Sequence, residues 1–106
     1  MVIASVVFTI LAGISVAQAQ TLKVTALGDS LTQGYGLLPD EGLVPQLQAW
    51  LTARGHDVSV LNAGVSGDTT AGGVRRINWL MKHEPKIVIL ALGANDGLRG
   101  LPVNEM

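Results

Sequence analysis

The stretch LKVTALGDSL, residues 22–31, sets a short apolar segment directly before a glycine and two polar side chains. Residues 22–27 are rich in apolar side chains and stop at Gly28, which predicts a buried strand followed by a sharp turn. Ser30 then lies just past the end of a strand, a position from which a hydroxyl can act as a nucleophile. Taken alone, the stretch favours a simpler interpretation, in which Asp29 or Ser30 caps a helical turn.

Strand-like and helix-like segments alternate after this stretch. The apolar spacing, glycines and prolines predict a loop over 28–41 with at most a helical turn after Ser30, then a helix over 43–54 and a strand over 58–61. They further predict a loop over 62–69, a helix over about 70–83, a strand over 86–92 and a loop over 93–100. The resulting βαβαβ order predicts an α/β fold with a parallel sheet. The last strand is β-branched and nearly uncharged, so we expect it to be buried on both faces.

The helix faces are predicted from the spacing of apolar residues. In the first helix the apolar face would hold Leu43, Leu47, Trp50 and Leu51, and in the second the inward residues would be Val74, Ile77, Leu80 and Met81. We expect Trp50 and Trp79 to pack within the fold. Arg75 and Arg76 are expected to lie on a solvated face.

Composition excludes several classes of protein. With 106 residues the chain holds at most one small domain, and 48% apolar residues are too many for a disordered chain. The net charge of −1 and the lack of a basic run give no support to the binding of nucleic acid or of an anionic membrane, so we expect no membrane partner beyond the N-terminal segment. The absence of cysteine excludes disulfides, thiolate metal sites and a cysteine nucleophile.

The N-terminal segment predicts an address outside the cytoplasm. Residues 1–17 carry no charge, and AQA at 17–19 fits the small-x-small pattern of a signal-peptidase site. We therefore expect a signal peptide over 1–19 and a periplasmic or secreted domain over 20–106. No Lys or Arg precedes the apolar run, since the first basic residue is Lys23. Either the true start lies upstream or the segment is atypical. An uncleaved N-terminal membrane anchor is the alternative to a signal peptide, because the apolar run approaches the ~20 residues needed to span a bilayer.

Three glycine-containing loops follow the three predicted strands. Parallel strands place such loops at the same carboxyl edge of the sheet, where α/β proteins bind ligands. Besides Ser30, the loops offer the backbone N–H of Gly67 near a helix start and the side-chain amide of Asn95. Both groups can donate to a developing oxyanion. Taken singly, the second loop is a capped turn and the third an Asx-turn.

Together the three loops carry a family resemblance. The sequences GDSLTQGYG (28–36), NAGVSGDTT (62–70) and LGANDGLRG (92–100) resemble the motifs of SGNH (GDSL-like) hydrolases, in particular the bacterial arylesterase, thioesterase and lysophospholipase branch. The resemblance runs from about residue 21 to the end. It implies the flavodoxin-like, three-layer fold of that superfamily, of which this chain would hold the βαβαβ front part. It also implies small acyl esters, thioesters or lysophospholipids as substrates, with no metal or organic cofactor.

The resemblance implies a role for each matched position. Ser30 matches the nucleophile, and its own N–H, the N–H of Gly67 and the amide of Asn95 match the oxyanion hole. The supporting positions are Gly28, Asp29 and Asp96. Tyr35, Leu37 and Leu38 are candidates for lining an acyl pocket.

The fourth motif of the family, Asp-x-x-His, has no match. Its His is the general base and its Asp orients that His. The two histidines here, His56 and His83, follow helices that return toward the amino edge of the sheet, so neither is expected to serve Ser30. We therefore expect the sequence to be truncated and, as it stands, inactive or nearly so.

Two other classes of function are weighed against a hydrolase. One is a binding or inactive module that keeps the pocket without the chemistry. The other is a flavodoxin-like phosphate or nucleotide binder, which is disfavoured because no loop matches a phosphate-binding glycine motif. The sequence makes no prediction of the oligomeric state.

Overall fold

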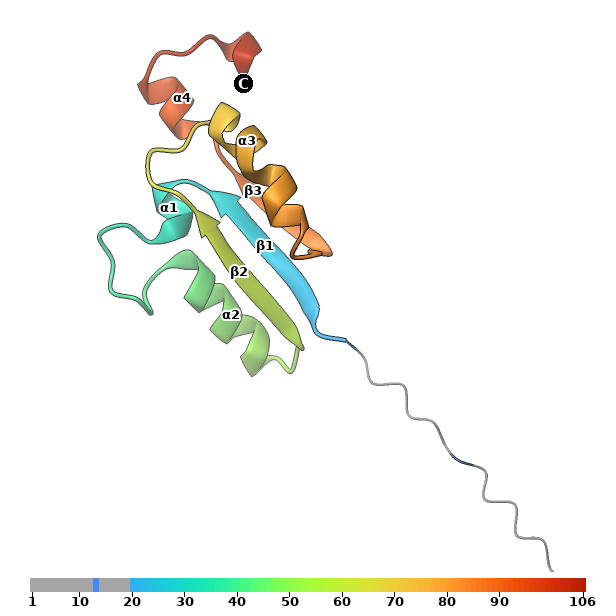
Figure 1. Cartoon of the computed structure of the whole chain (residues 1–106). Coiled ribbons are helices and arrows are strands. Elements are labelled where there is room, and N and C mark those ends of the chain that lie inside the picture. Colours follow the sequence, from blue (N-terminus) through green and yellow to red (C-terminus); the bar gives the residue numbers. More distant parts are fainter. Residues whose placement is uncertain (1–12, 14–19) are drawn as a thin grey trace, which may run out of the picture.

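A computed structural model describes Gly13 and residues 20–106. The signal peptide or anchor predicted over 1–19 therefore lies almost wholly outside the described residues. The described part forms a three-stranded parallel sheet in the order β2-β1-β3 (Figure 1). Its strands are β1 (Leu22–Gly28), β2 (Val58–Gly64) and β3 (Ile87–Ala91). The predicted α/β fold with a parallel sheet is confirmed.

Five helical segments accompany the sheet. They are α1 (Ser30–Gln33), α2 (Leu43–Ala53), α3 (Thr70–Met81), α4 (Ala94–Leu98) and the 3-10 turn η1 (Val103–Glu105). The crossover through α2 leads to one side of β1, and the crossover through α3 leads back to the other side. Because both crossovers are expected to be right-handed, α2 and α3 cover opposite faces of the sheet. In Figure 1, α2 runs along β2, whereas α3 runs beside β1 and β3.

Local signals explain where the longer helices begin and end. The side chain of Thr69 caps α3 by accepting a hydrogen bond from the backbone N–H of Gly72 at 3.2 Å. Pro45 fits the first turn of α2, where a missing N–H costs nothing. Gly55 follows that helix with φ of 78°, in the left-handed region that glycine tolerates.

Several segment boundaries differ from the sequence prediction by one or two residues, and two segments differ by more. Strand β2 continues three residues further, to Gly64, because its carboxyl end stays paired with β1 through Gly28. The segment predicted as a loop after β3 contains helix α4. Gly93, with φ of 121°, turns the chain out of the strand, and Asp96 lies in the first helical turn, where an acidic side chain is favourable.

The core is small, and its one cluster of contacting residues lies between α3 and the sheet. This cluster consists of Leu27, Ala63 and Leu80, with the partly buried Ile77 and Leu92 packed against them, while Val24, Ala26 and Val44 are also buried. Two of the residues predicted to point inward from α3 are exposed, Val74 at 73% and Met81 at 48%. The buried side of the helix runs instead through Gly72, Gly73 and Leu80. Val74 lies on the sheet side of the helix but is exposed, because it lines an open apolar groove next to the edge strand β3.

The apolar face predicted for α2 is also only partly buried. Val44 is its buried residue, whereas Leu43 and Trp50 are exposed. Both tryptophans are exposed, which contradicts the expectation that Trp50 and Trp79 pack within the fold. The guanidinium of Arg54 lies 3.6 Å from the centre of the Trp50 ring, and Trp79 meets His83 edge-on.

Strand β3 contradicts the expectation that it is buried on both faces. Ile87, Val88 and Leu90 are all exposed, Leu90 at 69%. The reason is its place in the sheet, since β3 pairs only with β1 among the described strands and lies at an edge. In the described part of the chain, no helix is both long and apolar enough to cross a membrane.

Candidate active site

The three predicted loops meet at the carboxyl edge of the sheet. The backbone N–H of Val65 donates to the carbonyl of Gly28 at 3.1 Å, which joins the loops after β1 and β2. The backbone N–H of Ser66 donates to the side-chain carbonyl of Gln33 in α1 at 3.1 Å. The amide of Asn95 donates to the carbonyl of Asp68 at 2.9 Å, which joins the loops after β2 and β3. Side chains some 30 residues apart in sequence therefore share one edge.

Ser30 is the first residue of α1 and is half-buried. The side chain of Asp29, which is only 3% exposed, caps this helix by accepting from the N–H of Leu31 at 2.9 Å. Neither the hydroxyl nor the backbone N–H of Ser30 has a hydrogen-bond partner among the described residues. Both groups are thus available to a ligand at the start of a short, capped helix.

Two glycines let α1 lie across the ends of the strands. A Cβ atom at Gly28 would overlap the side chain of Thr32, and a Cβ at Gly64 would overlap the backbone of Gln33. Gly28 therefore does more than permit the turn that the sequence suggested. With Gly64, it brings α1, the helix that begins at Ser30, into close contact with the sheet.

Gly67 has the geometry of a backbone donor. Its φ of 77° is left-handed, and its carbonyl accepts a hydrogen bond from the guanidinium of Arg99 at 2.7 Å. Within residues 20–106, the backbone N–H of Gly67 donates no hydrogen bond. The side-chain amide of Asn95 donates one of its two hydrogens to the carbonyl of Asp68, and the other remains available to a ligand.

Asp96 connects α4 to the beginning of α3. It is 2% exposed and accepts from the backbone N–H of Thr70 at 2.9 Å and from the Thr70 hydroxyl at 2.8 Å. The hydrogen bond from the Thr70 backbone is the main reason that the pKa of Asp96 lies below its ordinary value of 3.8, although burial acts in the opposite direction. A charged Asp96 therefore holds the loop carrying Asn95 against the loop carrying Gly67.

Arg76 is the site residue that sequence reasoning missed, because it was expected to be solvated together with Arg75. Its Nε contacts a carboxylate oxygen of Asp68 at 2.7 Å, and its two terminal nitrogens donate to the carbonyls of Ala63 at 2.6 Å and Gly28 at 2.9 Å. A signal was present in the spacing. Arg76 lies four residues after the buried Gly72 and four before the buried Leu80, which puts all three on one helix face.

The histidines lie where the sequence predicted, away from this edge. His83 lines a small depression with Lys23, near the start of β1. His56 follows α2, and its backbone N–H donates a hydrogen bond to the carbonyl of Leu51. Among the described residues, no histidine accompanies Ser30.

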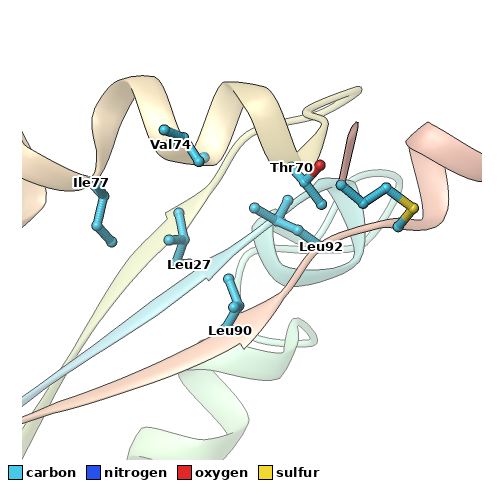
Figure 2. Close-up of a pocket in the computed structure, with 8 residues that line it drawn as sticks. Leu27, Thr70, Val74, Ile77, Leu90 and Leu92 are labelled. Carbon is cyan, nitrogen blue, oxygen red and sulfur yellow. The ribbon is translucent and has the colours of Figure 1, made fainter. Parts of the chain in front are cut away.

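An apolar groove of about 290 Å³ lies between α3 and β3. Figure 2 shows Val74 and Ile77 on the helix facing Leu27 and Leu90 on the sheet. The groove contains none of the candidate catalytic residues, and Leu27, Ile77 and Leu92 belong to both the groove and the core cluster. It is therefore an open side of the core. The candidate acyl-pocket residues Tyr35, Leu37 and Leu38 are exposed and do not line it.

Known proteins resemble the chain in sequence and in structure. It is 48% identical over 86 residues to esterase TesA of Pseudomonas aeruginosa, which covers 80% of this chain and 42% of that protein. It is 42% identical over 90 residues to an arylesterase of Vibrio mimicus, covering 84% and 45%. The crystal structure of AlinE4, an SGNH-hydrolase family esterase, superposes with a TM-score of 0.76 at 40% identity, covering 84% of this chain and 49% of AlinE4.

The chain thus spans about half the length of the relatives that it matches. Residues 26–106, which include all three loops, match the model of a single family. The flavodoxin-like architecture implied by the resemblance agrees with the superposition on an SGNH hydrolase. The chain belongs to the GDSL-like lipase/acylhydrolase family.

Proposed function

We propose that this chain is the front part of a serine hydrolase that cleaves carboxylic esters or thioesters through an acyl-enzyme at Ser30. One observation carries the proposal. An unpartnered serine hydroxyl at a helix start shares one sheet edge with two more unused donors, the N–H of Gly67 and the second amide hydrogen of Asn95. Donors fixed before the reaction can stabilise a negative oxygen without reorganising.

The proposed reaction assigns each group a step. The Ser30 oxygen attacks the carbonyl carbon, and the carbonyl oxygen takes up the negative charge facing the donors of Ser30, Gly67 and Asn95. The serine proton passes to a general base and then to the departing alcohol or thiol, leaving an acyl group on Ser30. Water activated by the same base releases the acid and restores the serine.

The general base is not among the residues of this sequence. The family resemblance assigns it to a His in an Asp-x-x-His motif, which has no match here. Losing the base of a serine hydrolase lowers kcat by a factor on the order of 10⁶. We therefore propose that the 106-residue chain alone has little or no activity and that a longer protein carries the reaction. The competing class, a binding module without chemistry, predicts that no completed form hydrolyses esters.

A fusion separates these two functions. Residues 20–106 replace the matching region of the Vibrio mimicus arylesterase, so that the rest of that relative completes the domain. We expect the fusion to hydrolyse an aryl ester and to be labelled by a serine-directed phosphonate. Ser30→Ala should abolish both signals, whereas Ser59→Ala, an exposed serine on β2, should change neither. Equal labelling of the Ser30→Ala protein would refute the assignment.

The same fusion ranks the substrates. Short aryl esters, acyl thioesters and lysophospholipids differ in leaving group and chain length, so their kcat/KM values identify the preferred class.

We further propose that residues 1–19 are a cleaved signal peptide and that the protein is periplasmic or secreted. Mass spectrometry of the secreted product should find Gln20 as the first residue, and an intact Met1 on a membrane-bound product would indicate the anchor instead.

A further inference from the structure

We infer that Arg76 is a positioning residue that holds the loop after β1, which carries Ser30, and the loop after β2, which carries Gly67, in one fixed geometry. The inference rests on the proposed function, because it concerns the same site. Arg76 lies on α3, outside all three sequence motifs, and its hydrogen bonds go to Asp68, Ala63 and Gly28 rather than to Ser30 or Gly67. Its effect would pass through the groups that it binds.

The guanidinium binds three separate pieces of the site. It donates to the carbonyl of Gly28, the last residue of β1, and to the carbonyl of Ala63, near the end of β2. Its Nε pairs with the carboxylate of Asp68 in the loop after β2. A planar fork of fixed donors can serve three acceptors in one arrangement, whereas a lysine ammonium is a single point of charge. Arg76 therefore fixes the distance between the two strand ends and the loop.

Asp68 transmits this arrangement to the proposed oxyanion donors. One carboxylate oxygen binds Arg76, while the other accepts from the N–H of Thr69 at 3.1 Å. The backbone carbonyl of Asp68 accepts from the amide of Asn95, and the preceding residue is Gly67. When Arg76 holds Asp68, the carbonyl of Asp68 orients the Asn95 side chain through a direct hydrogen bond. Asp68 also orients Gly67, to which it is joined by a peptide bond.

Partial burial makes the interaction more effective than a surface ion pair. The side chains of Arg76 and Asp68 are 22% and 11% exposed, so solvent screens the pair only in part. The carbonyl of Gly28 is also bound by Val65, so that a shift of Arg76 disturbs both loops at once. Since the oxyanion is absent from the bound substrate and forms only in the tetrahedral intermediate and its flanking transition states, misplaced donors should lower kcat and leave KM nearly unchanged.

The test compares Arg76 with its neighbour Arg75, which is exposed. In the fusion, Arg76→Ala should lower kcat about 100-fold, as a misplacement of roughly 1 Å can do, with KM within about threefold. Arg76→Lys, which keeps a charge for Asp68 but not the fork, should lose about tenfold. Arg75→Ala should stay within about twofold of the parent, as expected for a solvated residue. A kcat for Arg76→Ala equal to that of Arg75→Ala would overturn the inference.

A second measurement separates this inference from the proposed function and from simple unfolding. In ¹H–¹⁵N spectra of the full chain, Arg76→Ala and Arg76→Lys should shift the Gly67 backbone signal and the Asn95 side-chain signals, while Arg75→Ala leaves them in place. If the parent fusion is inactive, the proposed function fails and the spectra alone decide on Arg76. If Arg76→Ala does not fold, the lysine variant decides. Unmoved Gly67 and Asn95 signals, or a lysine variant with the parent's kcat, would refute the positioning role.

Discussion

The carboxyl edge of the sheet and the outer strand β3 are built in opposite ways. At the edge, three loops are tied by hydrogen bonds that converge on Arg76, Asp68 and Asp96. At β3, apolar side chains such as Ile87 and Leu90 lie exposed beside an open groove. The loops at the edge are held together by hydrogen bonds between described residues, whereas β3 offers an apolar surface that these residues do not cover.

The difference shows that two kinds of interaction determine the structure of the two regions, hydrogen bonds at the edge and apolar burial at β3. Polar contacts at the edge are directional, and they fix the three loops relative to one another within the described residues. Apolar burial has no direction and depends on the area covered. The same chain can therefore hold an ordered site next to a half-covered core, and substitutions in the two regions should have unequal effects.

The largest expected contrast is between two leucines on the same side of the sheet. Leu80 is 2% exposed in the core, and Leu80→Ala should lower the free energy of unfolding by about 2–5 kcal/mol. Leu90→Ala on β3 should change it by less than about 0.5 kcal/mol, because this side chain is already solvated. Urea denaturation of the full chain followed by circular dichroism measures both. Equal losses would mean that β3 is covered in solution, for example by a second copy, and would break the comparison.

The next effect tests the close approach at the edge. Gly64→Ala places a Cβ against the backbone of Gln33 and should lower the free energy of unfolding by about 2 kcal/mol through overpacking. Gly97→Ala in α4 is the matched control, since a Cβ there meets nothing within 4 Å. That control should be neutral or slightly stabilising, because alanine favours helix. A harmless Gly64→Ala would mean that α1 does not lie on the sheet as described.

These contrasts also show what the sequence could and could not predict. The order of strands and helices follows from local signals, such as Gly28 after an apolar run, the cap at Thr69 and Pro85 after α3. The meeting of Ser30, Gly67 and Asn95 at one edge follows from parallel topology. The exposure of β3 could not be predicted, because an apolar run does not reveal which strand lies at the edge of a sheet.

Arg76 was missed for a related reason. Two adjacent arginines in a helix usually face solvent, and the carbonyls that bind Arg76 belong to strand ends 13 and 48 residues away. Backbone acceptors carry no side-chain signature in a sequence. The exposure of Val74 likewise depends on the open groove beside the edge strand β3, which the local sequence around Val74 does not reveal.

A smaller effect is expected at the cap that starts α3. Thr69→Ala removes the oxygen that accepts from the N–H of Gly72 and should lower the free energy of unfolding by about 1 kcal/mol. Thr52→Ala, an exposed threonine of α2, serves as the control and should change it by less than about 0.5 kcal/mol. If both variants lose the same amount, the polar edge is not ordered by the start of α3.

The smallest effect sharpens the comparison through pH. The pKa of Asp96 is lowered in the folded chain, chiefly by the backbone N–H of Thr70, so folding favours its charged form. The stability that this group contributes is complete above its unfolded pKa of about 3.8 and is lost as the pH falls below that value through the folded pKa. Urea denaturation at several pH values between 6 and 3 should show that Asp96→Asn flattens the acid-side decline. Thr70→Ala, which keeps the backbone N–H and removes only the hydroxyl, should flatten it less. Should Asp96→Asn follow the parent curve at every pH, the charge of Asp96 would contribute nothing to holding the edge, and steric fit alone would account for the order of the third loop.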